Sequence, residues 1–320
     1  MSPLRIKPVE TPKELRAFIH LPYRLHKRHP AFVPPLISEV KDTLDRTKNP
    51  FFKHADMELF LAYRDSRVVG RIAAIEDSNF IQARQEMVGL FGFFDCIDDI
   101  TVSRALFNSA SQWLRKKHLR KMLGPANPSM NDEIGVLMNA FDIPPAIKMV
   151  WNPSYYPILY EENLFEKAKD IYAWEMNKED VSQRILQFGE TVLKRLKIQI
   201  RPVNLKRFKE EVMELRKIYN QAWSQNWGFV PWSEEEFLYA AKNLKKIVDP
   251  DLVLVAEDNG RPVGFSLALP DLNEALRHIN GRLFPFGLPF LLWYSRKIRS
   301  LRVLILGIIK EFRGRGIDSA

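Results

Sequence analysis

The chain has 320 residues, 46% of them hydrophobic and 27% charged, which is the composition of a globular protein long enough for two cores. Its formal net charge of +9 favours an anionic partner such as a nucleotide, a nucleic acid or an anionic membrane. The single cysteine, Cys96, excludes an intrachain disulfide and a cysteine-based metal site.

The first half predicts a mixed α/β order of elements. Its hairpin strands flank the turn Arg64-Asp65-Ser66-Arg67, and Asp98 or Asp99 is placed to cap the helix that follows the next strand. The predicted strands and extended segments are 5–9, 59–63, 68–75, 88–94, 121–124, 148–156 and 169–176. The predicted helices are 12–28, 100–118 and 131–141, with a further helix, 181–195, joining the two halves.

The second half repeats this order. It predicts strands at 199–203, 252–257, 262–269 and 303–309, helices at 205–224 and 234–247, and a hairpin turn at Asn259-Gly260. Two pairs of segments match at one offset. Ile6-Lys7-Pro8-Val9 matches Ile200-Arg201-Pro202-Val203 (200 − 6 = 194), and Ala62 with Val69-Gly70 matches Ala256 with Val263-Gly264 (264 − 70 = 194). The common spacing indicates a duplicated domain.

A glycine-rich turn follows the last predicted strand. It reads Phe312-Arg313-Gly314-Arg315-Gly316-Ile317-Asp318. A strand that turns through paired glycines towards a helix can place backbone N–H groups around a phosphate, and two arginines add positive charge. The sequence therefore predicts a phosphate-binding turn at 313–318.

The order of elements and this turn together resemble the GNAT acyltransferase family, whose motif is Arg/Gln-x-x-Gly-x-Gly/Ala after the fourth strand. The resemblance implies an α/β (α+β) fold of two tandem GNAT-like domains, with mixed, mostly antiparallel sheets flanked by helices. The expected boundaries are 1–178 for a degenerate first domain, 179–198 for a linking helix and 199–320 for an acyl-CoA-binding domain. Because the second copy ends soon after its turn, we expect it to be truncated, with about 75 residues missing by analogy with the first copy.

The resemblance implies acetyl-CoA, or another acyl-CoA, as co-substrate and no metal. The pantetheine arm would pair with the strand edge at Ile308, Ile309 and Lys310, and a backbone N–H of Ile308 or Ile309 would stabilise the thioester oxyanion. The diphosphate would lie on Arg313, Gly314, Arg315, Gly316, Ile317 and Asp318. Asp318 departs from the family's Gly or Ala, so we expect its carboxylate to point away from the phosphates. The proton donor to the leaving thiolate would lie on a helix beyond Ala320.

The equivalent turn of the first copy carries acids instead of glycines. It reads Asp95-Cys96-Ile97-Asp98-Asp99, so three carboxylates stand where a diphosphate would bind. This pattern argues against CoA binding in the first copy and favours a helix cap. The first copy is then a scaffold, or one side of the acceptor site.

Several other residues are candidates for contact with the acceptor. Asn127 and Asn131 lie in a loop and are candidates to contact substrate; the alternative is that Ser129 or Asn131 caps the helix that follows. Trp151 and Tyr155 either line a pocket or belong to the core. His26 and His29 stand three apart on a basic helix without acidic or cysteine partners, which predicts a solvated face and no metal site.

An apolar insertion, Leu283–Tyr294, contains Phe286 and Trp293 and precedes Arg296, Lys297, Arg299 and Arg302. Three roles are open for it: packing against the first domain, an apolar lid over the acceptor or acyl chain, and contact with a membrane interface. It is too short to span a bilayer, and Met1 to Glu10 does not read as a signal peptide, so the expected location is the cytoplasm.

The expected function is acyl transfer from acyl-CoA to an unknown small-molecule or peptide amine by direct attack. One alternative is an aminoacyl-tRNA-dependent transferase of tandem-GNAT type, although that donor needs no diphosphate-binding turn. Another is a non-enzymatic module that binds nucleic acid or protein. No aromatic–basic RNA-binding signature supports a nucleic-acid partner. The acceptor and the oligomeric state are not readable from the residues.

Overall fold

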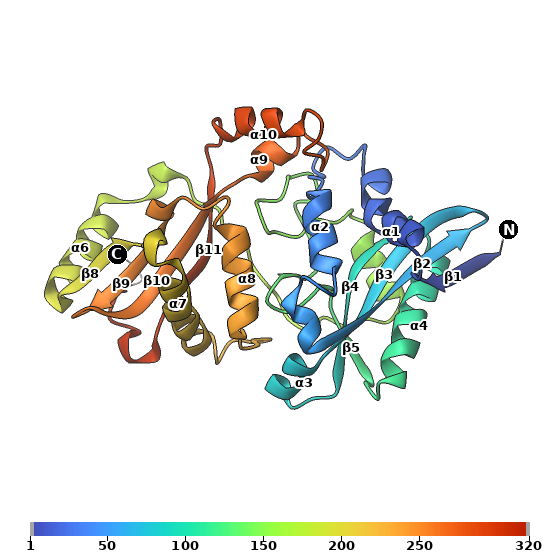
Figure 1. The fold of residues 1–320 in the computed structure, drawn as a ribbon, viewed down its shortest axis with the longest axis horizontal. Coiled ribbons are helices and arrows are strands. Elements are labelled where there is room, and N and C mark those ends of the chain that lie inside the picture. The colour runs from blue at the N-terminus through green and yellow to red at the C-terminus, as the bar shows by residue number, and fades with distance from the viewer. Residues whose placement is uncertain (1–2, 318–320) are drawn as a thin grey trace. The chain divides into compact units, whose positions relative to one another are not determined.

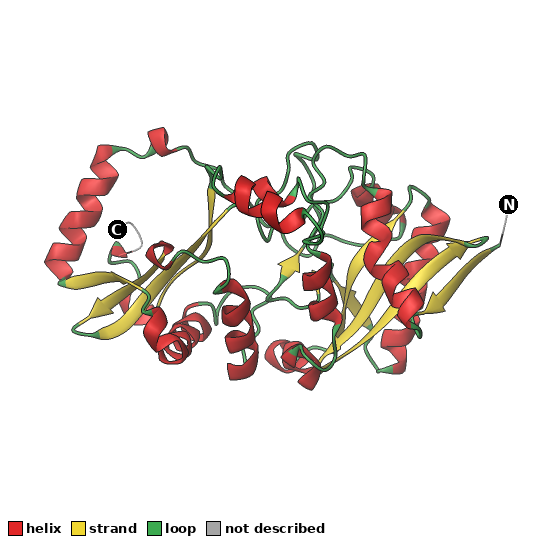
Figure 2. Ribbon diagram, turned by 45° about the horizontal axis from the view of Figure 1, so that its top comes forward, coloured by secondary structure: helices red, strands yellow, loops and turns green. Residues whose placement is uncertain are grey.

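The structure, a computed structural model, describes residues 3–317. It divides into two compact units. The first comprises Met1–Asp170 and Leu272–Ile298, and the second comprises Ile171–Asp271 and Arg299–Ala320. Each unit is a sheet with helices packed on it (Figures 1 and 2).

The first unit contains a five-stranded sheet of order β1-β2-β3-β4-β5. Its strands are β1 (Leu4–Pro8), β2 (Ala55–Arg64), β3 (Arg67–Asp77), β4 (Val88–Cys96) and β5 (Lys121–Leu123). All neighbours are antiparallel except β4 and β5, which pair in parallel over three residues. β4 therefore continues past the end of β5, and its last residues are free to meet other elements.

The first unit contains seven helices within the described residues, of which α1 and α4 pack on its sheet. They are α1 (Pro12–Leu25), α2 (Ile37–Leu44), α3 (Ser78–Arg84), α4 (Ile100–Lys116), α5 (Tyr156–Glu162), α9 (Asn273–Leu276) and α10 (Gly287–Ser295). Of these, α4 packs on β2 and β3, and α1 contacts the same two strands and β4. Local sequence fixes the helix starts: Thr11 and Glu14 form a capping box at α1, and Asp99 accepts a hydrogen bond from the Thr101 N–H at α4.

The second unit contains a four-stranded antiparallel sheet of order β11-β10-β9-β8. Its strands are β8 (Ile198–Pro202), β9 (Val253–Asp258), β10 (Arg261–Pro270) and β11 (Leu301–Ile308), and its helices are α6 (Gln183–Leu196), α7 (Phe208–Ala222) and α8 (Glu234–Leu244). α7 packs on β10 and β11, and α6 contributes Val192 to a core that also contains Ile309 and Phe312. Within the described residues β11 is an edge strand, and Leu306 on it is 50% exposed.

The register of the strands confirms the internal repeat. Ala62 lies opposite Gly70 in the first sheet, and Ala256 lies opposite Gly264 in the second. β1 and β8 occupy the same place, with Ile6 opposite Ala62 and Ile200 opposite Ala256. The offset of 194 residues read from the sequence is thus an offset between structurally equivalent positions.

Three local predictions in the first half are wrong. Residues 131–141 are not a helix; they contain the short strand β7 (Glu133–Ile134), which pairs with β6 (Ala126–Asn127). The Asn152 side chain explains the difference, because it accepts from the Leu137 N–H (2.7 Å) and donates to the Leu137 carbonyl (3.2 Å). The segments 148–156 and 169–176 are not strands either, and α5 begins at Tyr156.

The remaining regular elements are short 3-10 turns at Pro50–Lys53, Lys178–Asp180, Leu205–Arg207, Pro250–Leu252 and Lys310–Phe312. The insertion after β10 falls in the first unit, together with α9 and α10, and the helix expected to link the halves, α6, falls in the second. Among the described residues, no helix combines the length and apolarity needed to cross a membrane.

Candidate functional site: the β11 edge and its glycine turn

Ile308 and Ile309, the two residues predicted to stabilise an oxyanion, differ in the direction of their N–H groups. The Ile309 N–H donates to the Val263 carbonyl of β10 at 2.9 Å, so it is engaged in the sheet and is not a free donor. Successive N–H groups of a strand point to opposite sides, and therefore the Ile308 N–H points away from β10, towards the free edge. Of the two candidates, Ile308 is the one whose amide faces outward.

The same edge carries an irregularity that turns the strand. Leu267 lies opposite Ile305 and Ala268 lies opposite Val303, so Leu304 is an extra residue in β11. β4 of the first unit also has an extra residue, nearer to the end of its strand, where Arg71 lies opposite Asp95 and Ala73 lies opposite Gly92. A β-bulge bends a strand and releases backbone groups from the ladder, which is why bulges often border active sites.

The turn after β11 has the backbone of an anion-binding loop. Gly314 and Gly316 have φ angles of +69° and +85°, a region that L side chains rarely adopt. They flank Arg315, and within the described part of the chain no backbone carbonyl accepts from the N–H of any of these three residues. Alternation of this kind directs successive N–H groups to one side, where they can bind a phosphate.

The side chains of the turn take different directions. The Arg313 guanidinium is committed to backbone, since its Nε donates to the Ile308 carbonyl (3.2 Å) and its Nη2 donates to the Ala222 carbonyl at the end of α7. It therefore fixes the turn against α7. Arg315 lies over the Phe312 ring at 4.8 Å and is exposed, so its charge is available to a ligand. Asp318 lies outside the described residues.

The other two predicted cofactor-binding residues, Lys310 and Ile317, differ in their exposure to solvent. Lys310 is exposed, whereas Ile317 is 5% exposed and belongs to the core of the second unit. Phe188 and Val192 of α6 lie 3.2–3.4 Å from where a Cβ on Gly316 would stand. Apolar side chains of α6 and the buried Ile317 thus anchor the turn to the core of the second unit.

Sequence reasoning missed the aromatic side chains that α7 and α8 bring to this edge. The Trp223 ring lies directly on Gly307, where an added Cβ would come within 2.0 Å of the ring. Trp223 stacks on Tyr219 (ring centroids 4.7 Å apart) and contacts Phe265. Tyr219 also contacts Phe229, Trp232 and Phe237. The signal was available: Gly307 breaks an otherwise apolar strand, and a strand glycine often marks close approach by another group.

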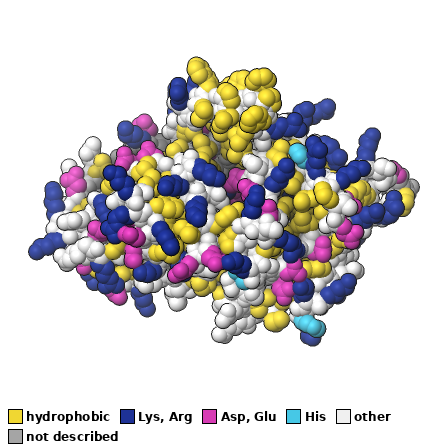
Figure 3. All heavy atoms as spheres, viewed as in Figure 1, with side chains coloured by type: hydrophobic (Ala, Val, Ile, Leu, Met, Phe, Trp, Pro, Cys, Tyr) yellow, Lys and Arg dark blue, Asp and Glu magenta, His cyan; other side chains and the backbone are white. Residues whose placement is uncertain are grey.

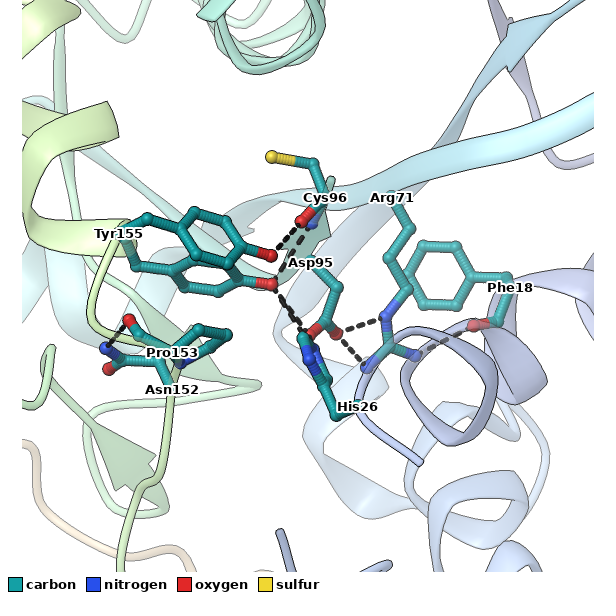
Figure 4. A network of polar contacts seen from close by, with 9 residues as sticks. Phe18, His26, Arg71, Asp95, Cys96, Asn152, Pro153 and Tyr155 are labelled. Carbon is teal, nitrogen blue, oxygen red and sulfur yellow. Dashed lines mark hydrogen bonds and ion pairs between the residues drawn. The ribbon is translucent and has the colours of Figure 1, made fainter. Parts of the chain in front are cut away.

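In the first unit the strand equivalent to β11 is β4, and a buried polar network surrounds its end (Figure 4). Asp95 lies within β4, and its carboxylate accepts from Arg71 (2.7 and 2.8 Å), His26 (2.9 Å) and the Tyr156 hydroxyl (3.1 Å). Burial alone would raise the pKa of Asp95, but the Arg71 charge and the His26 hydrogen bond outweigh it and hold that pKa below its usual value.

This network corrects two predictions. Asp95 is not part of the turn: it is the penultimate residue of β4, and its side chain points inward. His26 does not lie on a solvated face, since it is 6% exposed and packs against Trp151 and Phe32. Its partner acid is 69 residues away in the sequence, so no local pattern could reveal it.

The other two acids of the first turn act as expected for a helix cap. Asp99 caps α4 and forms an ion pair with Arg64 at 2.8 Å, and Asp98 is exposed. The turn of the first copy is also shorter. Ile97 donates to Val69 as Ile309 donates to Val263, yet α4 begins only three residues after Ile97. There is no room here for a glycine turn like that after β11.

The six residues predicted to contact the acceptor all lie in the first unit. Asn127 accepts from the Phe93 N–H (2.6 Å) at the bulge of β4, which assigns it to the support of that strand. The Asn131 N–H donates to Ser129 Oγ (3.2 Å) in a loop and caps no helix. Trp151 donates to the Phe141 carbonyl (2.9 Å), and Tyr155 donates to the Cys96 carbonyl (2.7 Å). Phe286 and Trp293 are exposed near and on α10.

Cys96 and the acids offer no alternative chemistry. Burial raises the pKa of the Cys96 thiol, which lies against the core of the first unit. Within residues 3–317 no group of three or more His, Cys, Asp or Glu side chains is placed to hold a metal ion. The β11 edge and its turn are the candidate site.

Comparison with known proteins places the chain in a family. No protein-family model matches the chain. It is 38% identical to the bacterial ceramide synthase of Caulobacter vibrioides over 316 residues, which is 97% of this chain and 82% of that protein. It is 36% identical to the protein YghO of Escherichia coli over 304 residues, 94% of this chain and 77% of that one. The chain belongs to the family of these two proteins.

Solved structures show the same fold at low sequence identity. A tandem GNAT protein from the clavulanic acid biosynthesis pathway aligns with 99% of this chain and 82% of its own length, at a TM-score of 0.50 and 10% identity. A GCN5-related glucosamine N-acetyltransferase region in a fungal multi-domain β-N-acetylglucosaminidase aligns with 99% of this chain at a TM-score of 0.51 and 13% identity. This chain spans 33% of the length of that fungal protein. The predicted fold class, two tandem GNAT-like domains, is confirmed.

Proposed function

We propose that the protein is an acyl-CoA-dependent N-acyltransferase that transfers a fatty acyl group to the amine of a long-chain amino alcohol. The observation that carries the proposal is the edge of β11 that has no strand partner within residues 3–317, where the outward amide of Ile308 precedes the glycine turn. The name of the Caulobacter relative supports the substrate class, because a ceramide is the fatty amide of such an amino alcohol.

The residues of the second unit fit the donor. The N–H groups of Gly314, Arg315 and Gly316 have no carbonyl partner within the described chain, and a diphosphate would satisfy them. The exposed Arg315 guanidinium adds a charged donor. Within residues 3–317 this edge of β11 has no strand partner, so it can hydrogen bond to the amide groups of the pantetheine arm as an added strand would.

The reaction requires a hydrogen-bond donor that stabilises the oxyanion. The nucleophile is the amine of the acceptor, so the protein does not have to supply one. The neutral amine nitrogen of the acceptor attacks the thioester carbonyl, the Ile308 N–H stabilises the negative oxygen that forms, and the carbon–sulfur bond then breaks. The amine loses one proton to a base or water, and the CoA thiolate gains one. The products are the amide and free CoA.

Aromatic side chains next to this edge suit long apolar substrates. Trp223 lies on Gly307, one residue before Ile308, and its stack with Tyr219 extends towards Phe229 and Trp232. A binding site for hydrocarbon is lined mainly by such rings, with few polar groups. The Arg313 side chain, tied to Ala222 and Ile308, joins the helix that carries these rings to the strand that carries the amide.

A direct assay tests the proposal. The purified protein is incubated with palmitoyl-CoA and sphinganine, free thiol is measured, and the amide is identified by mass spectrometry; acetyl-CoA serves as the comparison donor. We expect amide formation with the long-chain donor. Absence of both thiol release and amide under these conditions would contradict the proposed reaction.

A matched pair of variants tests the turn. Gly314 and Gly260 both have positive φ angles (+69° and +79°), and an added Cβ at either would meet nothing within 4 Å. Alanine at each costs about 1 kcal/mol of backbone strain, so any loss beyond that belongs to the site. Gly314→Ala should weaken CoA binding about tenfold or more, because strain at this positive φ moves the N–H groups of the turn out of line with the phosphate, and each hydrogen bond to a charged group contributes about 1.5–3 kcal/mol. Gly260→Ala should leave it unchanged, and equal effects would remove the turn from the site.

A further inference from the structure

The first unit presents a large apolar surface to solvent. The segment Leu283–Tyr294, called the apolar segment below, has six large hydrophobic side chains that are 45–85% exposed. They are Phe284, Phe286, Leu288, Phe290, Leu292 and Trp293. α10 has no buried residue, and Figure 3 shows the hydrophobic side chains gathered over it. A helix that is apolar on all sides is normally covered, so this surface indicates a binding partner.

The apolar segment is held by an ordered base. Ala275, Leu276 and Ile279 at and after α9 are buried, and the Gly281 carbonyl accepts from the Ile37 N–H at 3.0 Å. Gly281 has a φ angle of +71°, and a Cβ there would come within 2.5 Å of the Pro35 carbonyl. The close fit at Gly281 fixes where the apolar segment leaves the fold.

A second contact fixes the direction of α10. A Cβ on Gly287 would lie 1.7 Å from the Arg282 carbonyl, so only glycine allows this approach. His278 stacks on Tyr294 with ring centroids 3.9 Å apart. The exposed rings are therefore presented by a packed platform and not by a loose chain.

Positive charge surrounds this surface. Between residues 275 and 298, all of them in the first unit, the sequence has four Lys or Arg residues and no Asp or Glu. Lys297 lies over the Trp293 and Tyr294 rings, at 5.0 and 5.6 Å. An open cavity of about 350 Å³ at the base of the apolar segment is lined by Lys13, Arg16, Ala17, His20 and Arg282.

The cations of this cavity lack acidic partners. None of Lys13, Arg16 and Arg282 forms an ion pair with a described carboxylate. Burial, together with the charges of Arg16 and Arg282, lowers the pKa of His20. Three unpaired cations around a hollow are complementary to a phosphate group.

From this combination we propose that the apolar segment and the adjoining basic cavity bind the surface of an anionic phospholipid bilayer. The exposed rings enter the interface and Arg16 and Arg282 meet lipid phosphates. α10 has nine residues, too few to cross a bilayer but enough to lie in its interface. A protein partner would need acids to match the cations, whereas a phospholipid offers hydrocarbon and phosphate side by side. The inference does not depend on the proposed activity.

Vesicle flotation tests the proposal on the full chain. One set of vesicles contains phosphatidylcholine alone, and the other contains equal parts of phosphatidylcholine and phosphatidylglycerol. We expect the protein to float with the mixed vesicles and to bind them about tenfold or more tightly than the neutral ones, since each cation near an anionic surface is worth about fivefold in affinity. Equal binding to both sets, or no binding to either, would overturn the proposal.

Variants at exposed positions locate the contact. Phe284→Ser combined with Phe290→Ser should reduce binding to the mixed vesicles about tenfold or more, because each ring buries on the order of 150 Å² or more when it inserts. The matched control is Tyr172→Ser with Trp174→Ser, two aromatic residues that are 73% and 91% exposed elsewhere and should matter little. Equal losses in the two pairs would refute the location.

Two further measurements distinguish a lipid surface from free phosphate and from a second copy of the chain. Arg16→Gln with Arg282→Gln should abolish the preference for the mixed vesicles, and free inorganic phosphate at the concentration of lipid phosphate should not compete. Sedimentation velocity on the same samples tests for a second copy of the chain as the occupant. Self-association lost in the Phe284/Phe290 variant, without vesicle binding by the parent, would assign the surface to a dimer and overturn the proposal.

Discussion

Replacing Asp95 by asparagine should destabilise the first unit strongly, although the change is nearly isosteric. The carboxylate is 13% exposed and receives hydrogen bonds or ion pairs from Arg71, His26 and Tyr156. Arg71 is 9% exposed at its side chain, donates also to the Phe18 carbonyl at 2.8 Å, and lies over the Phe18 ring at 4.9 Å. Asparagine therefore leaves the Arg71 charge buried without a counter-ion.

The size of the effect follows from that unpaired charge. Removal of one partner of a buried ion pair costs about 3–5 kcal/mol. In a unit of this size 1 kcal/mol shifts Tm by about 2–4 °C, so Asp95→Asn should lower Tm by about 6–20 °C. Asp98→Asn, at an exposed position in the same turn, is the matched control and should change stability by less than about 0.5 kcal/mol.

Thermal unfolding by circular dichroism measures the shift, and hydrogen exchange of peptides from β3 and β4 assigns it to the first unit. Adding Arg71→Met to Asp95→Asn should recover at least about 1 kcal/mol relative to the sum of the single variants, because the lone charge is gone. If Asp95→Asn melts like Asp98→Asn, or if the two changes at Asp95 and Arg71 simply add, the network does not stabilise the unit and the reasoning fails.

Three further predictions concern the pH dependence of the Asp95 network, the backbone N–H groups at the end of β11, and the Asn127 side chain. The pKa of Asp95 is lowered in the folded state, so its stabilising contribution is present above the unfolded value of about 3.9 and is lost as pH falls through the folded pKa. In urea titrations, the difference in unfolding free energy between the parent and Asp95→Asn should therefore be constant from about pH 7 to 5 and should shrink below about pH 4. Ile308→Pro removes an N–H that faces away from β10, so it should lower kcat about 100-fold or more in the amide-forming assay with little change in Tm. Ile309→Pro removes the hydrogen bond to Val263 and should lower Tm. The opposite pattern would show that the Ile308 N–H does not donate to the oxyanion. Asn127→Ala should cost about 1–3 kcal/mol in unfolding free energy, because the Phe93 N–H loses its acceptor at the bulge of β4, and a neutral result would exclude this structural role.

Much of the fold was readable because its signals are local. The Asn259-Gly260 turn forms the β9–β10 hairpin as expected, and the repeat at an offset of 194 gave equivalent positions in both sheets. Gly314 and Gly316 were singled out by spacing alone, and both adopt the positive φ angles that such a turn requires. These features depend on a few neighbouring residues, so the sequence carries them without help from the rest of the chain.

Other features depend on partners far away in the chain. No local sequence pattern indicates that His26 and Asp95, 69 residues apart, form a hydrogen bond. Asn152 likewise binds the Leu137 backbone from 15 residues away, in a segment where a helix was predicted. A buried ion pair or a side chain that satisfies a backbone group is chosen by packing, and local propensity cannot anticipate it.

By itself the sequence determined the repeat, the order of strands and the glycine turn after β11. Only the tertiary structure decided which amide at the end of β11 faces outward, since that depends on the register of Ile309 against Val263. It likewise decided that Trp223 lies on Gly307 and that the apolar segment stays exposed on the first unit. The physical reason is the same in each case. Backbone propensity and turn chemistry act over a few residues, whereas the direction of a hydrogen bond and the covering of a surface depend on elements brought together by folding.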